Sequence, residues 1–183
     1  MESQPIQLWT IGHSTRSLEE FIALLAENKI AALADVRQFP GSRRVPQFNS
    51  ENLSAALARQ GIEYFHFVEL GGRRKVLPDS PNIAWRHPAF RGYADYMMTP
   101  PFHNGISRLL ELAKSKRTAI MCAEAVWWRC HRGLISDFLK AHGQEVIHIL
   151  GKGKTESHPF TSAAKIVDGK LSYASGEPEF FFD

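Results

Sequence analysis

The sequence has few cysteines and no long hydrophobic run, and each shortage excludes a class of protein. Only two of its 183 residues are cysteine, Cys122 and Cys130, which excludes a disulfide-rich secreted scaffold. No apolar run approaches the roughly 20 residues that a bilayer-spanning helix needs, so we expect no membrane partner. The first residues, Met1 to Pro5, have neither a basic start nor an apolar stretch. We therefore expect no export signal, a cytoplasmic location and reduced thiols.

An excess of charge of one sign is also missing. The formal net charge is +3 at pH 7 and the isoelectric point is about 9.0. The basic clusters are short, namely Arg43-Arg44, Arg73 to Lys75, and Lys152 to Lys154, and each is typical of a solvated loop. This mild basicity is compatible with an anionic small molecule or nucleic acid as a partner. The composition gives no indication of the oligomeric state.

What the sequence does contain is an alternation of short apolar, β-rich runs with longer helical patterns, which indicates βαβ units and a parallel sheet. With no internal repeat or linker, it predicts a single domain over residues 1–183, with a core over 6–150 and a C-terminal hairpin segment over 158–175. The predicted fold is α/β, three-layer and doubly wound, with about five mainly parallel strands and a C-terminal β-hairpin.

The expected elements follow from these patterns. The predicted strands are Leu8 to Ile11, Ala31 to Val36, Ile62 to Phe67, Thr118 to Met121, and Glu145 to Ile149. One predicted helix begins after Ser17, which forms a capping-box pattern with Glu20, and another begins after Asn49 or Ser50. Three further helices are predicted over Phe90 to Met98, Phe102 to Lys114, and about Cys130 to His142. Asp168-Gly169, between two short β-rich runs, predicts a tight hairpin.

Reactive side chains follow several of the predicted strands. In an open parallel sheet, ligands bind outside the carboxyl ends of the strands. We therefore expect Arg37, Glu124, Cys130 and His131 to meet in a single pocket. The candidate catalytic residues are His13, Glu124, Cys130 and His131.

Cys130 lies at the predicted start of a helix, where the N–H groups and the dipole favour a thiolate. His131 beside it can act as a base or a donor, and Glu124 has apolar neighbours that suit a general acid or base. Two structural alternatives stay open: Cys130 packs as a small apolar residue, and Glu124 pairs with Arg37 or Arg129.

Other residues are candidates for binding an anion. They are Ser14, Arg37, Arg43 and Arg132, and possible additional site residues are Cys122 and Tyr93. Arginine offers forked donors that suit phosphate, and Ser14 follows a tight turn at Gly12-His13 that can hold a phosphate or carboxylate. An inert core thiol is the alternative for Cys122.

A metal centre is a further alternative, because Cys122, Cys130, His131 and His13 are ligand types for zinc or iron. The gap between the cysteines is not a zinc-finger spacing, and adjacent Cys and His side chains on a helix would point apart. We therefore assign no metal and no cofactor from the sequence.

Motifs along nearly the whole chain together resemble those of one family. They are Thr10-Ile11-Gly12-His13-Ser14, Asp35-Val36-Arg37 with Pro40, Leu70-Gly71-Gly72, Tyr93 to Met97, Cys122-Ala123-Glu124, Cys130-His131-Arg132, and His158-Pro159-Phe160-Thr161. The combination is similar to the domain of unknown function 488 family. The resemblance implies a compact α/β protein, chiefly microbial, and no particular reaction.

The sequence thus predicts an enzyme acting on a phosphorylated or nucleotide-like substrate. A non-catalytic nucleotide or nucleic-acid binding module is the first alternative, and a metal-binding or thiol-redox protein is the second.

Overall fold

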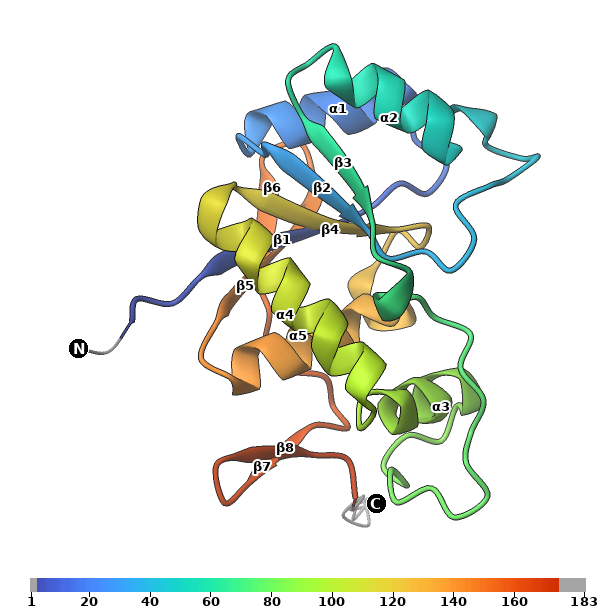
Figure 1. Ribbon diagram of the computed structural model, residues 1–183, viewed down its shortest axis with the longest axis vertical. Coiled ribbons are helices and arrows are strands. Elements are labelled where there is room, and N and C mark those ends of the chain that lie inside the picture. The colour runs from blue at the N-terminus through green and yellow to red at the C-terminus, as the bar shows by residue number, and fades with distance from the viewer. Residues whose placement is uncertain (1–2, 175–183) are drawn as a thin grey trace, which may run out of the picture.

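The computed structural model describes residues 3–174, and its centre is a six-stranded sheet with helices on both faces (Figure 1). The strands are β1 (Gln7–Gly12), β2 (Ala32–Asp35), β3 (Glu63–His66), β4 (Thr118–Cys122), β5 (Glu145–Gly151) and β6 (Lys154–Ser157). Their order is β3-β2-β4-β1-β5-β6, and every pair is parallel except β5 with β6. The predicted mainly parallel, three-layer α/β fold is confirmed.

Helices α1 (Leu18–Glu27) and α2 (Ser50–Ala58) lie above the sheet in Figure 1, while α4 (Pro100–Ser115) and α5 (Arg132–Ala141) lie below it, with α3 (Pro88–Tyr96) beyond them. Successive residues of a strand point to opposite faces. Leu33 of β2 accordingly packs in the core with α1 and α2, and its neighbour Ala34 packs in the core with α3, α4 and α5. Each face of the sheet therefore has its own hydrophobic core.

The first helix begins where the sequence predicts. The Ser17 side chain accepts a hydrogen bond from the backbone N–H of Glu20 at 3.1 Å. The carboxylate of Glu20 pairs instead with Arg16, so only one half of the expected capping box forms. One bond from the serine is sufficient to satisfy an N–H group of the first turn.

Strand β6 is absent from the sequence prediction, which treated Lys152 to Lys154 as a solvated loop. Gly153 adopts φ 66° in the turn after β5, and this left-handed backbone allows the chain to return antiparallel to β5. The residues of β6 are mostly exposed at the edge of the sheet. Their polar composition therefore carries no burial pattern from which a strand could be predicted.

The C-terminal hairpin is confirmed and pairs β7 (Lys165–Val167) with β8 (Lys170–Ser172). Asp168 and Gly169 have φ values of 51° and 76°, as a two-residue type I′ turn requires. Beyond β8, the hydroxyl of Tyr173 donates to Asp137 of α5 at 2.6 Å and so fastens the segment to the domain. Residue 175, the last of the predicted hairpin segment, lies outside the described residues, as do 1, 2 and 176–183.

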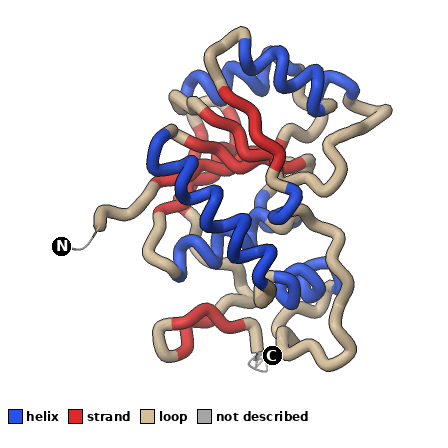
Figure 2. The backbone as a smooth tube through the Cα atoms, viewed as in Figure 1, coloured by secondary structure: helices blue, strands red, loops and turns tan. Residues whose placement is uncertain are grey.

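Three short 3-10 helices, η1 (Pro46–Phe48), η2 (Val68–Leu70) and η3 (Trp127–Arg129), lie within the connections. Figure 2 shows the long loop that joins η2 to α3 along one side of the molecule. Within residues 3–174, no helix is both long enough and apolar enough to cross a bilayer.

The register of the central strands brings their carboxyl ends level. Gly12 of β1 is opposite Cys122 of β4, and Asp35 of β2 is opposite Met121. The loops that leave β1, β2 and β4 therefore start at one edge of the sheet, next to each other. This edge holds the candidate site.

Candidate functional site

A cavity of about 560 Å³ opens at this edge, on the side of the sheet that α3, α4 and α5 cover. Its lining residues are Gly72, Arg73, His87, Ala89, Phe90, Tyr93, Cys122, Glu124, Arg129, Cys130 and His131. They come from the η2–α3 loop, from α3, from the last residue of β4, and from the segment between β4 and α5. Glu124, Cys130 and His131 therefore share one cavity, as expected from the sequence.

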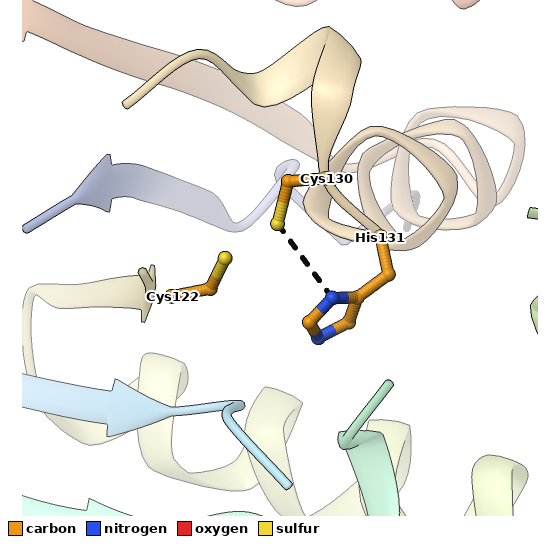
Figure 3. Close-up of side chains that lie close together, drawn as sticks. All are labelled: Cys122, Cys130 and His131. Atoms are coloured by element: carbon orange, nitrogen blue, oxygen red, sulfur yellow. Dashed lines mark hydrogen bonds between the residues drawn. The ribbon is translucent and has the colours of Figure 1, made fainter. Parts of the chain in front are cut away.

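Two thiols and an imidazole from the lining of this cavity lie close together (Figure 3). The Sγ atoms of Cys122 and Cys130 and a ring nitrogen of His131 all lie within 4.8 Å of one another. Cys130 Sγ lies 3.6 Å from His131 Nδ1. Cys122 is the last residue of β4, whereas Cys130 and His131 immediately precede α5.

The expectation that Cys130 and His131 point apart on a helix is wrong. Cys130 has an extended backbone, with φ −140° and ψ 152°, and His131 is the N-cap of a helix that begins at Arg132. Because the two residues lie before the first turn, their side chains are free to converge.

Three other residues restrict the position of the His131 ring. Its Nε2 donates to the carbonyl oxygen of Val36 at 2.9 Å, at the end of β2. The ring of Tyr93 lies over it, with the centroids 5.0 Å apart, and a Cβ on Gly72 would meet its Nδ1 at 3.2 Å. Because Nε2 carries the proton in the neutral ring, Nδ1 presents a lone pair toward Cys130.

The two thiols differ in their ionisation. Burial opposes ionisation of Cys130, but the hydrogen bond from Cys122 and the charge and backbone N–H of Arg132 lower its pKa to about 7. The hydrogen bond to Cys130, followed by burial, raises the pKa of Cys122 well above its usual value. Burial also lowers the pKa of His131, which favours the neutral ring.

Two further lining residues have contrasting environments. Tyr93, a possible additional residue in the sequence prediction, is buried and donates its hydroxyl hydrogen bond to the carbonyl of Leu70 at 2.7 Å. Burial raises the pKa of this phenol well above its usual value. Glu124 is exposed, and its carboxylate pairs with no cation in the described part of the chain. The alternative raised from the sequence, an ion pair of Glu124 with Arg37 or Arg129, is absent from that part of the chain.

Arg37 and His13 lie outside the cavity, so the expectation of one pocket containing Arg37 is wrong. Strand alternation turns Arg37 toward the opposite face of the sheet, where its guanidinium binds the buried carboxylate of Asp35 at 2.7 Å. His13 stacks on Phe48 with centroids 4.5 Å apart, and its Nε2 lies 3.4 Å from Arg37 Nη1. Burial lowers the pKa of His13.

The remaining anion-binding candidates also lie elsewhere. Arg132 is buried, and its guanidinium donates to Thr10 Oγ1 at 3.0 Å and to the carbonyl of Glu124 at 2.7 Å. The N–H of Ser14 donates to the carbonyl of Ala123 at 2.9 Å and is therefore not available to a phosphate. Arg43 lies exposed in the loop after β2 and is not among the lining residues.

Two arginines that the sequence did not single out line the cavity instead. Among the described residues, the guanidinium groups of Arg73 and Arg129 have no hydrogen-bond or ion-pair partner, although Arg73 lies 5.6 Å from the ring centroid of Phe39. Arg73 also adopts φ 61°, a conformation that non-glycine residues rarely take. A strained backbone of this kind in a long loop is a structural signal for a functional site, but no sequence pattern reveals the strain.

Comparison with known proteins yields one match. The family model described as "Domain of unknown function DUF488" matches residues 17–139, which is more than half of the chain. The motifs at 10–14 and 158–161 lie outside the matched range. No curated protein and no solved structure gives a match.

Proposed function

The chain belongs to the family described as "Domain of unknown function DUF488", and from the cavity we propose that it is an enzyme acting on a phosphorylated or nucleotide-like substrate. The observation that carries this proposal is that one cavity contains both a thiol–imidazole cluster and two arginines that have no partner within residues 3–174. In this proposal the arginines bind the substrate, and the thiol–imidazole cluster takes part in the reaction.

Arg73 and Arg129 are the groups that would hold the phosphate. Their donors are not used by another described residue, in contrast to those of Arg37 and Arg132, which bind Asp35 and the backbone. A planar guanidinium binds two phosphate oxygens in parallel, which favours phosphate over a simple halide. Phe90 and Tyr93 give the same cavity an aromatic wall against which a flat base can lie.

Glu124 is the group that would move a proton in the reaction. Its carboxylate lines the cavity and is exposed to solvent, so it can exchange protons with water as well as with a bound substrate. Its backbone is held by the guanidinium of Arg132, which accounts for the buried position of that arginine. In this proposal Arg132 positions the segment that carries Glu124.

The cluster of Cys122, Cys130 and His131 distinguishes an enzyme from a binding module. A module that only binds nucleotides needs cations and aromatic rings. It has no use for two buried thiols and a neutral imidazole directed at each other. These groups together form a reactive centre, and we therefore favour catalysis over binding alone.

Thermal unfolding tests the binding half of this proposal. Inorganic phosphate, adenosine monophosphate and a short oligonucleotide are added separately to the wild type and to Arg73→Gln and Arg129→Gln. A ligand at a hundred times its dissociation constant stabilises the native state by about 2.7 kcal/mol, or about 5–10 °C in a domain of this size. We expect both variants to lose most of this shift. Equal shifts in wild type and variants would contradict binding in the cavity.

Two further variants complete the experiment. Arg59→Gln removes an exposed arginine of the α2 region and is the matched control, and Arg43→Gln tests the prediction made for that residue from the sequence. Turnover of the stabilising compound is followed by chromatography. Glu124→Gln should keep the thermal shift and lose turnover. A shift without turnover in the wild type would favour the binding module instead.

A further inference from the structure

The thiol–imidazole cluster has the composition of a transition-metal site. Two cysteine sulfurs and one histidine nitrogen, all within 4.8 Å of one another, match the donor types that select zinc over magnesium or calcium (Figure 3). The three donors come from two separate segments, the end of β4 and the turn before α5. A bound ion would therefore join the two segments at the edge where the carboxyl ends of the strands lie.

The orientation of His131 is an independent observation that points to a metal. Metal-binding histidines usually donate their second ring N–H to a backbone carbonyl or a carboxylate, which fixes the ring and the tautomer. His131 does this through Nε2 and the carbonyl of Val36 at 2.9 Å. Its Nδ1 is thus the atom left to bind, and it is the atom that lies 3.6 Å from Cys130 Sγ.

The surroundings of the sulfurs suit thiolates. The backbone N–H of Arg132 lies 3.4 Å from Cys130 Sγ and donates to it, and the buried guanidinium of the same residue places a positive charge nearby. Both features offset the negative charge that two thiolate ligands bring into a buried site. When the thiols bind an ion, their S–H protons pass to solvent.

We propose that Cys122, Cys130 and His131 bind one Zn²⁺ or a chemically similar ion as three protein ligands, with the fourth coordination position facing the cavity. Three protein ligands and an open position distinguish a catalytic zinc site from a structural one, which has four. The open position would take a water molecule or a substrate oxygen. The proposal rests on the function proposed above only in so far as the cavity that receives the fourth ligand is the substrate cavity.

A reversible disulfide is the competing use of the same two thiols. Cys122 and Cys130 are both free thiols, and their sulfur atoms lie within 4.8 Å of each other. A disulfide would join the sulfurs directly and leave His131 without a role. The position of the imidazole beside the two thiols therefore favours the metal.

Cobalt binding tests the proposal directly. The full chain is prepared reduced and free of metal and is titrated with Co²⁺, whose complexes with thiolates have intense near-ultraviolet charge-transfer bands and visible bands. We expect saturation at one Co²⁺ per chain and loss of the bands when Zn²⁺ is added. Cys122→Ser, Cys130→Ser and His131→Asn should each weaken binding more than tenfold, while His103→Gln, on an exposed part of α4, should bind as the wild type does.

Folding of each variant is checked by circular dichroism, and a variant that does not fold is replaced by alanine at the same position. Absence of thiolate bands in the folded, reduced wild type would overturn the proposal, and so would unchanged affinity in all three ligand variants. Loss of both thiols to a disulfide in air, with no cobalt bands after reduction, would identify the redox alternative. If cobalt does not bind but phosphate still stabilises the protein, the metal proposal is wrong and the proposed function stands. If cobalt binds but no anion stabilises the protein, only the metal site stands.

Discussion

The Nε2 atom of His131 donates to the carbonyl oxygen of Val36 over 2.9 Å, although 95 positions separate the two residues in the sequence. This bond links the start of α5 to the end of β2. It also determines which nitrogen of the ring faces the thiols. The thiol–imidazole cluster is therefore held by the backbone at the end of a central strand of the sheet.

Gly72 leaves the space that His131 occupies. A methyl group at this position would lie 3.2 Å from Nδ1, so the ring must shift by a few tenths of an ångström in Gly72→Ala. Because metal affinity depends on the orientation of each ligand, we expect Co²⁺ to bind about tenfold more weakly. Competition with a chromophoric chelator measures the change. Gly41→Ala, where a methyl group meets nothing within 4 Å, is the control, and equal affinities in the two variants would contradict this role for Gly72.

Gly12 is required by a close approach of two backbones. A Cβ on this residue would lie 1.7 Å from the carbonyl oxygen of Glu124, so β1 and the loop after β4 cannot keep their positions in Gly12→Ala. We expect the free energy of unfolding in urea to fall by about 3 kcal/mol, the upper part of the usual range for overpacking. Gly151→Ala, with open space around it, should change stability by less than about 1 kcal/mol. Similar losses in both variants would show that the contact is not the cause.

Much of this fold follows from the sequence, because its central strands are buried. Strands β1, β2 and β4 are buried along nearly their whole length, and the hairpin carries its signal in Asp168 and Gly169. Strand β6 cannot be predicted from the sequence, because this exposed edge strand has no apolar pattern. Local patterns thus predict an element where burial or a specific turn leaves a signal in the sequence.

Burial of His148 makes the stability of the protein depend on pH. Desolvation, together with the nearby charges of His158 and Arg132, lowers the pKa of His148 to about 2 from an ordinary value near 6.5. Between these values the unfolded chain binds a proton that the native protein does not, so stability rises with pH up to about 6.5 and is lost as pH falls below it. The contribution is about 1.4 kcal/mol for each pH unit.

Urea unfolding between pH 4 and pH 7 measures this dependence. His148→Gln keeps a donor and an acceptor for His158 and Thr10 but does not titrate in this range. The slope of its stability against pH should be smaller than that of the wild type by about 1.4 kcal/mol per unit. Parallel slopes would mean that His148 takes up its proton over the same pH range in the native and the unfolded protein.

The carboxylate of Asp137 accepts hydrogen bonds from residues of the C-terminal segment. His158 Nε2 donates to it at 2.7 Å, the backbone N–H of Thr161 at 2.8 Å, and the hydroxyl of Tyr173 at 2.6 Å. In Asp137→Asn an amide N–H₂ replaces an acceptor and faces these donors. We expect a loss of about 3 kcal/mol in the free energy of unfolding. Limited proteolysis should also cleave beyond residue 158 faster than in the wild type.

The matched control for this prediction is Asp79→Asn, which changes an exposed carboxylate in the loop before α3. It should unfold and be cleaved as the wild type is. Cleavage of Asp137→Asn at the wild-type rate would contradict the proposed attachment of the segment to α5.

The candidate site follows from the sequence only in part. The rule that strand ends share an edge correctly groups Glu124, Cys130 and His131. It fails for Arg37, because it says nothing about which face of the sheet a side chain takes after the strand ends. Arg73 and Arg129 are missed for a different reason, since whether an arginine has a partner depends on residues far away in the chain.

The hydrogen bond from Tyr173 to Asp137 also has a consequence for the order in which the protein is made. Synthesis proceeds from the N-terminus, so α5 emerges while the residues that satisfy its carboxylate are still to be joined. Until Thr161 and Tyr173 are present, the carboxylate of Asp137 lacks two of the donors that it has in the native protein. The native set of hydrogen bonds to α5 is therefore complete only when the last described segment of the chain has been made.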